Sequence, residues 1–338
     1  MKAITYDRFG AARDVLRLQE IETLRPEPGE VTVDLVFSGV NPSDVKARAG
    51  SRPGVTKPPY PQVIPHSDGA GVITAVGEGV STGRIGERVW IWNGQWRRAF
   101  GTAASQITLP QEQAVVLPEN VDFETGASLG IPGLTAAFTV FSGGDVTGKT
   151  VLIQGGAGTV GLLAVQLAKW GGAKVIATAR GAGADRARDA GADIVIDYSD
   201  ADLAARILAA NSGHPVDRIV EVEFGKNIAT DTEVIAENGT ICAYGSALEM
   251  EPVFPFYPLL FKAVTVEIAL IYLLTTDQRA ETIDRLTRAL SESALQCPVE
   301  RIFPLADCAA AHEAVEAEGV ESFEDGVREV ISVDNIAF

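Results

Sequence analysis

The 338-residue sequence has few of the residue types that build disulfide scaffolds and metal centres. Its three cysteines, Cys242, Cys297 and Cys308, are odd in number and form no CxxC pair, so the sequence indicates neither a disulfide framework nor a cysteine zinc site. We interpret all three as small core residues. Only three histidines are present, and one of them, His66, lies close to Asp68 in a glycine-rich turn, which raises the question of a metal site.

Long apolar runs and positive charges are also scarce. No run reaches the roughly 18–20 residues that span a bilayer, and the opening residues MKAITYDRFG lack the apolar centre of a signal peptide. We therefore expect a soluble cytoplasmic protein with no membrane partner. Because 45 acidic residues outnumber 28 basic ones, the net charge of −17 argues against a nucleic-acid partner. With only eight lysines, this balance also suggests a protein kept soluble in high salt.

The chain is long enough, and at 46% hydrophobic residues apolar enough, to form two domains. Residues 1–125 have the pattern of short strands and turns. From 148 to about 272, apolar β runs alternate with amphipathic helices, which is typical of a parallel sheet. We therefore expect an α/β protein in which 1–124 and 278–338 form one β-rich domain and 125–277 forms a doubly wound parallel-sheet domain.

The run TVLIQGGAGTVG gives the clearest functional signal, because it places a GxGxxG motif between a strand and an amphipathic helix. In this context Gly156 serves the tight turn, Gly158 allows backbone approach to a pyrophosphate, and Gly161 allows the helix to pack on the strand. The helix then opens at Thr159 and Val160, where its N-terminus binds an anion. The alternatives are a glycine-rich turn in an unliganded α/β protein and a methyltransferase.

The end of the next strand, IATARGAGADR, decides the choice of cofactor. No Asp or Glu ends this strand, and Arg180 stands roughly 20 residues past the glycine loop, where a ribose-binding carboxylate is usual. A 2′-phosphate therefore fits better than a free hydroxyl, and the sequence favours NADPH over NADH. The alternative for Arg180 is a solvated loop residue.

Six stretches distributed over essentially the whole chain carry a family resemblance: SGVNPSDVKARAG, PHSDGAGVITAVGEGV, WIWNGQWRRAFGTAASQ, IPGLTAAF, GGAGTVG and AAAHEAVE. In these stretches the chain resembles the medium-chain dehydrogenases/reductases, specifically the zinc-free quinone oxidoreductase branch related to zeta-crystallin. The resemblance implies a Rossmann domain and a GroES-like catalytic domain. It also implies NADPH-dependent, zinc-independent reduction of quinones or other α,β-unsaturated carbonyls.

The resemblance bears on the metal question. Zinc-dependent relatives carry Gly-His-Glu before the glycine turn, and the register places His66 on the glycine, Ser67 on the histidine ligand and Asp68 on the glutamate. Asn41 stands where those relatives have a cysteine ligand. Zinc needs about three or four converging ligands, so the sequence predicts no metal site, and the substrate would be an acceptor that is already electron-poor. We interpret His66 as a turn residue, with a pocket residue and a metal ligand as alternatives.

The resemblance also implies a catalytic group. Asn41 would lie near the nicotinamide and the substrate with its amide as a donor, or else is only a turn residue before Pro42. Many family members have a tyrosine where this chain has Lys46, so either Lys46 or Tyr60 is expected to be the donor to the substrate, unless Lys46 is only solvated. Four aromatic residues are expected either to form the floor of a pocket for a flat ring or to pack in the core: Trp90, Trp92, Trp96 and Phe100.

Further cofactor contacts follow from the same resemblance. Thr135 would approach the nicotinamide half, Tyr198 would flank the adenosine phosphate, and Gly245 with Ser246 would border the crevice at the strand ends. Glu221 and Glu223 are unusual so close to a phosphate-binding crevice, and we expect them on a solvent-facing side of their strand.

Two other functions fit the same scaffold. A reductase of enoyl or acryloyl thioesters needs a basic surface for the nucleotide part of coenzyme A, and the acidic composition weakens that reading. A non-enzymatic NADPH-binding protein of the crystallin kind would not oxidise NADPH with any quinone.

The run AVTVEIALIYLL, residues 263–274, is expected to be the last strand of the parallel sheet, with no later strand to cover its edge. Only Glu267 interrupts its apolar character. Pairing of this strand with its copy in a second subunit would satisfy both edges, as the resemblance to family dimers also implies, so we expect a homodimer. The alternative is that the chain's own C-terminal segment caps the strand.

Overall fold

A computed structural model describes residues 1–51, 54–321 and 328–333, and it forms two compact units. The first unit contains Met1–Ile131, Cys297–Glu321 and the described residues 328–333. The second unit contains Pro132–Gln296. None of the helices in the described part of the chain combines the length and the apolar character that a membrane span requires.

The borders of the units differ from the predicted domain borders. The sequence placed 278–338 with the N-terminal domain, but α10 (Thr276–Ser291) packs on α4 (Leu134–Phe141) in the second unit. A hydrophobic stripe on α10, which includes the fully buried Leu286, explains this choice of partner. The last predicted residues of the N-terminal domain, 334–338, lie outside the described residues.

The first unit is mainly β-structure. Its strands are β1 (Lys2–Thr5), β2 (Arg17–Glu20), β3 (Glu30–Val40), β4 (Asp68–Val76), β5 (Arg88–Ile91), β6 (Gln106–Pro110), β7 (Ala114–Val116), β14 (Val299–Pro304) and β15 (Arg328–Ser332). Its helices are α1 (Ala12–Val15), α2 (Pro42–Ala49), α3 (Phe123–Gly126) and α11 (Cys308–Glu321), with short turns of helix at η1 (Thr82–Arg84), η2 (Gln111–Gln113) and η5 (Leu305–Asp307). The chain passes to the second unit within η3 (Leu129–Gly133).

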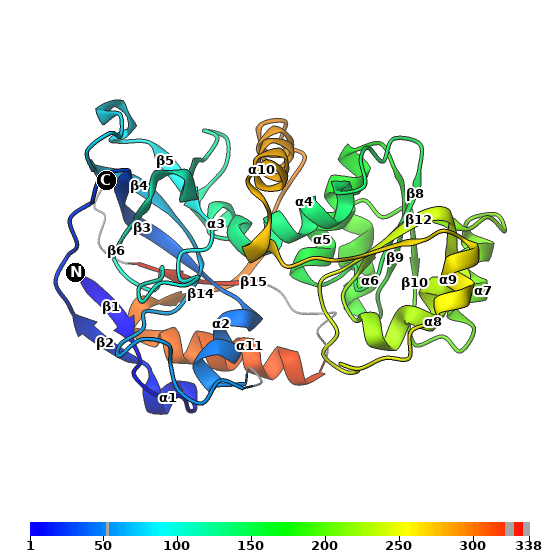
Figure 1. The fold of residues 1–338 in the computed structure, drawn as a ribbon, viewed down its shortest axis with the longest axis horizontal. Helices are drawn as coiled ribbons and strands as arrows, with labels where there is room; N and C mark the ends of the chain where they lie inside the picture. The colour runs from blue at the N-terminus through cyan, green and yellow to red at the C-terminus, as the bar shows by residue number, and fades with distance from the viewer. Residues whose placement is uncertain (52–53, 322–327, 334–338) are drawn as a thin grey trace. The chain divides into compact units, whose positions relative to one another are not determined.

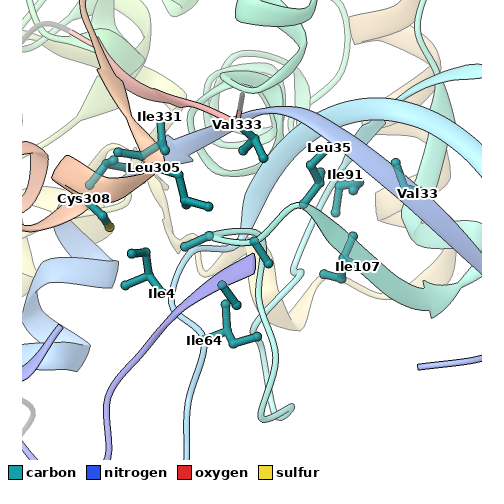
Figure 2. Close-up of a cluster of buried hydrophobic side chains, with 14 of the residues drawn as sticks. Ile4, Val33, Leu35, Ile64, Ile91, Ile107, Leu305, Cys308, Ile331 and Val333 are labelled. Carbon is teal, nitrogen blue, oxygen red and sulfur yellow. The ribbon is translucent and has the colours of Figure 1, made fainter. Parts of the chain in front are cut away.

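Strand β3 organises the first unit. It pairs antiparallel with β4, β6 and β15 in a seven-stranded sheet, while β1 and β2 form a separate pair. Val31, Val33 and Leu35 alternate along β3 and are buried on one side, as the sequence pattern predicts. They join a core that includes Ile64 and Cys308 (Figure 2).

The second unit alternates strands and helices (Figure 1). Its strands are β8 (Thr150–Ile153), β9 (Lys174–Thr178), β10 (Ile194–Ile196), β11 (Val216–Glu221), β12 (Ile235–Ala243) and β13 (Thr265–Ile268). Besides α4 and α10, its helices are α5 (Thr159–Trp170), α6 (Ala182–Asp189), α7 (Leu203–Ala210), α8 (Phe224–Val234) and α9 (Phe256–Phe261), with a 3₁₀ turn at η4 (Ile271–Leu273).

The six strands are all parallel to their neighbours in the order β10-β9-β8-β11-β12-β13. This is the 3-2-1-4-5-6 order of the dinucleotide-binding fold, so the predicted doubly wound sheet is confirmed. Leu152, Ile219 and Ile241 project from three central strands into a cluster with side chains of α7, α8 and α9. The order reverses between β8 and β11, and in such sheets ligands bind at the carboxyl ends of the strands at this point.

Strand β13 lies at the edge of the sheet, as predicted, but it is shorter than the apolar run suggests. The strand ends at Ile268, and the chain turns into η4 at Ile271. Ile268 is 70% exposed, whereas Ile271 is 4% exposed. The second half of the run therefore buries Ile271 and leaves Leu270 and Leu273 about half exposed, instead of extending the strand.

Candidate functional site

The turn after β8 excludes side chains. Gly155 adopts a left-handed conformation with φ of +70°. A Cβ atom on Gly161 would lie 2.1 Å from the carbonyl oxygen of Gly155, and one on Gly156 would lie 2.7 Å from the Cβ of Ala177. Gly161 thus allows the close packing that the sequence predicts. The left-handed turn is made by Gly155, one residue before the glycine to which the motif assigns it.

Helix α5 begins directly after this turn. Its N-cap is Gly158, in extended conformation, and no side chain of that residue caps the helix. The N–H groups in the first turn of a helix, here at Thr159, Val160 and Gly161, have no acceptor within the helix. Together with the helix dipole they favour a bound anion, so this end of α5 can hold a phosphate.

A buried chain of hydrogen bonds holds the turn from behind. The N–H of Gly155 donates to Oγ1 of Thr178 at 3.0 Å, and that hydroxyl donates to Oε1 of Gln154 at 2.8 Å. The Nε2 of Gln154 in turn donates to Oδ1 of Asp231 at 3.0 Å. The position of the turn is therefore coupled to α8, which carries Asp231.

Glu221, at the end of β11, is fully buried, so the predicted solvent-facing position is wrong. Because β11 lies between β8 and β12 with both faces of the sheet covered, it has no solvent-facing side. The carboxyl group lies close to that of Asp231 and accepts from Nδ2 of Asn227 at 3.1 Å. Burial, reinforced by Asp231, raises the pKa of Glu221 well above its usual value, and burial raises the pKa of Asp231 to about 6.

Glu223 is also buried, and the predicted solvent-facing position is wrong for this residue too. Its carboxylate accepts from the backbone N–H groups of Ala247 and Leu248, each at 2.8 Å. The first N–H groups of α8 donate to the carbonyl oxygen of Gly245 and to Oγ of Ser246. Glu223 therefore fixes the loop after β12, which contains both residues that the family resemblance places at the crevice.

Three further predicted cofactor residues lie in the second unit. Arg180 is exposed just after β9, and its Cζ lies 5.3 Å from the centre of the Tyr198 ring, which follows β10. The two residues predicted at the adenosine end thus lie together. Thr135 is buried in the first turn of α4, where its carbonyl oxygen accepts from Oγ1 of Thr139 at 2.8 Å.

Asn41 lies in the first unit as the N-cap of α2, and it is 2% exposed. Its Nδ2 donates to Oδ2 of Asp44 at 3.1 Å and to Oδ2 of Asp68 at 3.0 Å, and its backbone N–H also donates to Asp44. Two carboxylates therefore fix the orientation of this amide. Both donors of the amide are directed at them, so donation to a substrate requires one of these bonds to be exchanged.

An aromatic cavity of about 290 Å³ lies in the first unit. Tyr6, Phe9, Tyr60 and Trp96 are among the described residues that line it, and Arg97 adds a positive charge. Lys46 is exposed on α2 and is not one of the lining residues. Of the two predicted donors, the structure therefore places Tyr60 and not Lys46 in the cavity wall.

The aromatic cluster expected from the sequence is divided. Trp96 lines the cavity, whereas Trp90 is fully buried on β5 and Phe100 packs against the core of the first unit. Trp92 donates from Nε1 to the carbonyl oxygen of Glu112 at 3.0 Å. Trp96 thus forms part of a pocket wall, whereas Trp90 and Phe100 pack in the core.

Ser67 and Asp68, at the positions of zinc ligand and glutamate in the zinc-dependent relatives, are buried beside Asn41. In the part of the chain that the structure describes, neither belongs to a group of three or more His, Cys, Asp or Glu residues placed to hold a metal ion. The residues at the family's zinc positions are thus a serine and an amide tied to carboxylates.

Comparisons with known proteins agree with both units. Residues 27–141 match the alcohol dehydrogenase GroES-like domain, and residues 159–288 match the zinc-binding dehydrogenase family. The quinone oxidoreductase of Rattus norvegicus is 32% identical over 260 residues, covering 75% of this chain and 76% of the relative. The chain belongs to the quinone oxidoreductase family. The family membership predicted from the sequence motifs is confirmed.

Solved structures extend this similarity to the whole chain. A mycobacterial quinone oxidoreductase is 28% identical with a TM-score of 0.85, covering 98% of this chain and 100% of the other. A mycobacterial protein solved with NADPH is 28% identical with a TM-score of 0.83 over the same shares. The predicted Rossmann and GroES-like architecture of a quinone oxidoreductase is therefore confirmed.

Three residues that shape the site of this family member were not predicted from the sequence. Gln154 and Thr178 hold the glycine turn, and Asp231 holds Gln154. A local signal existed only for Gln154, which stands directly before the glycines. The others act through contacts with segments distant in sequence.

The buried acid pair predicts a pH dependence of stability. Because the pKa values of Glu221 and Asp231 are raised, the folded state keeps protons that the unfolded state releases, and the free energy of unfolding falls as pH rises from about 4 through about 6 and beyond. Asp231→Asn keeps an oxygen for Gln154 and offers Glu221 an N–H donor. We expect this variant to be more stable than the native protein by about 1–3 kcal/mol at pH 8, and about equally stable at pH 4.

Urea denaturation at pH 4, 6 and 8 in one buffer of fixed ionic strength measures this difference. The control is Glu251→Gln, which removes an exposed acidic charge and should leave the pH dependence unchanged. If Asp231→Asn kept the native pH dependence of stability, the protons retained by the folded state would not belong to Glu221 and Asp231.

Proposed function

We propose that this protein is an NADPH-dependent reductase of quinones and of other electron-poor α,β-unsaturated carbonyls. The observation that carries the proposal is the aromatic cavity of the first unit, walled by Tyr60 and Trp96, in a chain of the quinone oxidoreductase family. Flat aromatic walls favour a flat ring as the substrate. Asn41 and Ser67 at the family's zinc positions support an acceptor that needs no Lewis acid.

The second unit fits NADPH. The glycine turn and the uncapped start of α5 suit the pyrophosphate, because their backbone N–H groups and missing side chains allow close approach. Strand β9 ends without a carboxylate, and the exposed Arg180 beside Tyr198 supplies a cation for the 2′-phosphate. The mycobacterial relative solved with NADPH supports the same choice.

NADPH supplies a hydride when bound, and the chain's own residues prepare the acceptor. The aromatic walls hold the ring of the substrate and exclude water from it. The Tyr60 hydroxyl is the group in the wall that can donate a proton to the reduced oxygen. Asn41 is buried with its amide bonded to Asp44 and Asp68, so it can bind the substrate only by exchanging one of these bonds.

Arg180→Ala tests the cofactor assignment. Loss of a charge-assisted phosphate contact of about 1.5–3 kcal/mol should weaken NADPH binding by about 10- to 150-fold and leave NADH binding nearly unchanged. Fluorescence titration with both cofactors measures the effect. Arg188→Ala, an exposed arginine on α6, is the control and should change neither affinity. Equal losses for NADPH and NADH in Arg180→Ala would show that Arg180 does not read the phosphate.

Two cavity variants separate binding from proton donation. Trp96→Ala should raise KM for a naphthoquinone about tenfold, because an aromatic contact is worth about 0.5–1.5 kcal/mol. Tyr60→Phe should lower kcat about 100-fold with little change in KM, because only the hydroxyl is lost. NADPH oxidation at saturating cofactor measures both, and Trp92→Phe, outside the cavity wall, is the control. If neither variant changes NADPH oxidation by any quinone, the cavity is not the substrate site.

The assembly proposed here is a homodimer formed through the second unit. A surface around α9 and β13, here called the α9–β13 patch, exposes at least half of each of Phe256, Tyr257, Leu260, Phe261, Ile268 and Leu273. The one acidic residue of β13, Glu267, does not guard the edge, because its carboxylate accepts from Oγ of Ser142 and lies 3.6 Å from Sγ of Cys242. An unguarded apolar edge of this kind is suited to a second copy of the chain.

Phe261→Glu and Ile268→Lys should each shift the protein from about twice the 35.7 kDa chain mass to the chain mass in light scattering at micromolar concentration. Ile85→Lys, which changes another exposed isoleucine in the first unit, should keep the dimer mass. Ile271 is unsuitable for this test because it is buried within its own subunit. A native protein that scatters as a monomer, or patch variants that keep the double mass, would exclude this interface.

A further inference from the structure

Three metal-binding side chains converge in the interior of the first unit. His66, Cys308 and His312 are each fully buried, and one ligand atom from each lies within 4.8 Å of the others. The Nε2 atoms of the two histidines are 2.8 Å apart, and Sγ of Cys308 is 3.8 Å from Nε2 of His66. Figure 2 draws Cys308 among the apolar side chains of this core.

Helix α11 supplies two of the three groups. Cys308 and His312 are four residues apart, so they lie on the same face of the helix, one turn from each other. Two ligands at this spacing on one helical face form half of many metal sites. The third group, His66, comes from the turn before β4, 246 residues away in sequence from His312.

The backbone of His66 is a second, independent observation. This residue has φ of +77°, in the left-handed region that favours glycine, and it occupies the position where zinc-dependent relatives of the family have glycine. Positive φ is uncommon for a residue other than glycine, and positions of this kind are frequent in functional segments, but Asn93 and Arg97 of the same unit also have positive φ. His66 is thus held in a backbone conformation that glycine adopts more easily.

The surroundings orient His66 as a ligand. Its Nδ1 lies 2.9 Å from Oγ of Ser38, and that hydroxyl lies 2.9 Å from Oγ1 of Thr102. A hydrogen bond at Nδ1 directs the other ring nitrogen, Nε2, toward the cluster, which is how histidine ligands are usually fixed. Between the two facing Nε2 atoms only one hydrogen fits, and Nδ1 of His312 is buried without a partner among the described residues. Without a metal, the cluster therefore leaves one buried ring nitrogen, Nδ1 of His312, without a hydrogen bond among the described residues.

We propose that His66, Cys308 and His312 form a binding site for a monovalent soft metal ion, cuprous copper. A thiolate with two imidazoles is a soft ligand set, and the described residues offer three ligands where zinc prefers four. The charges nearby do not select the ion, because the guanidinium of Arg48 is paired with Glu316 and the carboxylate of Asp44 also lies near the cluster. The assignment rests on the softness and the number of the ligands.

Binding needs small movements and releases one proton. Ligand bonds of about 2.0 Å at 120° separate two nitrogens by about 3.4 Å, so the imidazoles must open by about 0.6 Å, while the sulfur–nitrogen distance already suits the ion. A cysteine binds a metal as the thiolate, so the metal displaces the thiol proton: Cu⁺ and the thiol give the copper thiolate and H⁺.

The site is separate from the positions of the family's zinc ligands, which hold Asn41 and Ser67 in this chain, and it does not depend on the proposed reductase activity. It departs from the sequence prediction that the chain has no metal ligands. The three ligands are far apart in the sequence, and only the fold brings His66 next to His312 and Cys308.

Anaerobic titration of the full-length reduced protein with cuprous ion, in competition with bicinchoninate, tests the proposal. We expect one equivalent of copper per chain, an ultraviolet copper–thiolate absorption, and an affinity that rises about tenfold per pH unit. Cys308→Ser and His66→Gly should each weaken binding at least 100-fold. His66→Gly relieves φ of +77° but also leaves a cavity in the core, so circular dichroism and the melting temperature of each variant are measured before the titration. Cys297→Ser, another buried cysteine of the same unit, should bind like the native chain.

Failure of the native protein to take copper from bicinchoninate would overturn the proposal, as would unchanged binding in Cys308→Ser and His66→Gly. Zinc held as tightly as copper by the same residues would overturn the assignment to a monovalent ion. A rise in melting temperature on adding cuprous ion, seen in the native protein and in Cys297→Ser but absent in His66→Gly, would support it independently of absorption.

Discussion

The contact between the glycine turn and helix α5 sets the geometry of the nucleotide-binding unit. Helix α5 can approach the end of β8 only because Gly161 has no side chain, since a Cβ atom there would lie 2.1 Å from the carbonyl oxygen of Gly155. This approach places the uncapped start of the helix at the carboxyl end of the sheet. Gln154 and Thr178 then hold the turn from the strand side. The anion site that we propose at this helix thus depends on a contact between backbone atoms, which explains why its signature in the sequence is a set of glycines.

Features encoded within a short stretch of chain were predictable. The alternation over 30–40 gives β3, and the strand–glycine–helix run gives β8 and α5, because each pattern needs only its own neighbours to form. The doubly wound sheet followed from the succession of such stretches, and the family followed from the quoted motifs. The glycine turn and the missing carboxylate at the end of β9 are likewise visible in the sequence.

Features that depend on partners distant in sequence were not predictable. Glu221 is buried because other strands and helices cover both sides of β11, and its partner Asp231 comes from the following helix. Ile268 and Ile271 belong to one apolar run, yet the chain turns between them and buries only the second. His66 faces His312 across 246 residues. In each case the deciding quantity is a three-dimensional neighbour, on which local periodicity carries no information.

The α9–β13 patch gives the surface of this protein an unusual response to its solvent. The chain carries 17 excess negative charges, whose mutual repulsion acts over about 10 Å at 0.1 M salt but only about 3 Å at 1 M. Salts excluded from protein surfaces also strengthen the tendency of exposed Phe261 and Ile268 to leave water. Both effects act in the same direction. Concentrated salt therefore favours burial of the α9–β13 patch, and dilute salt favours its exposure to water. The salt concentration thus shifts the balance between the covered and the exposed patch.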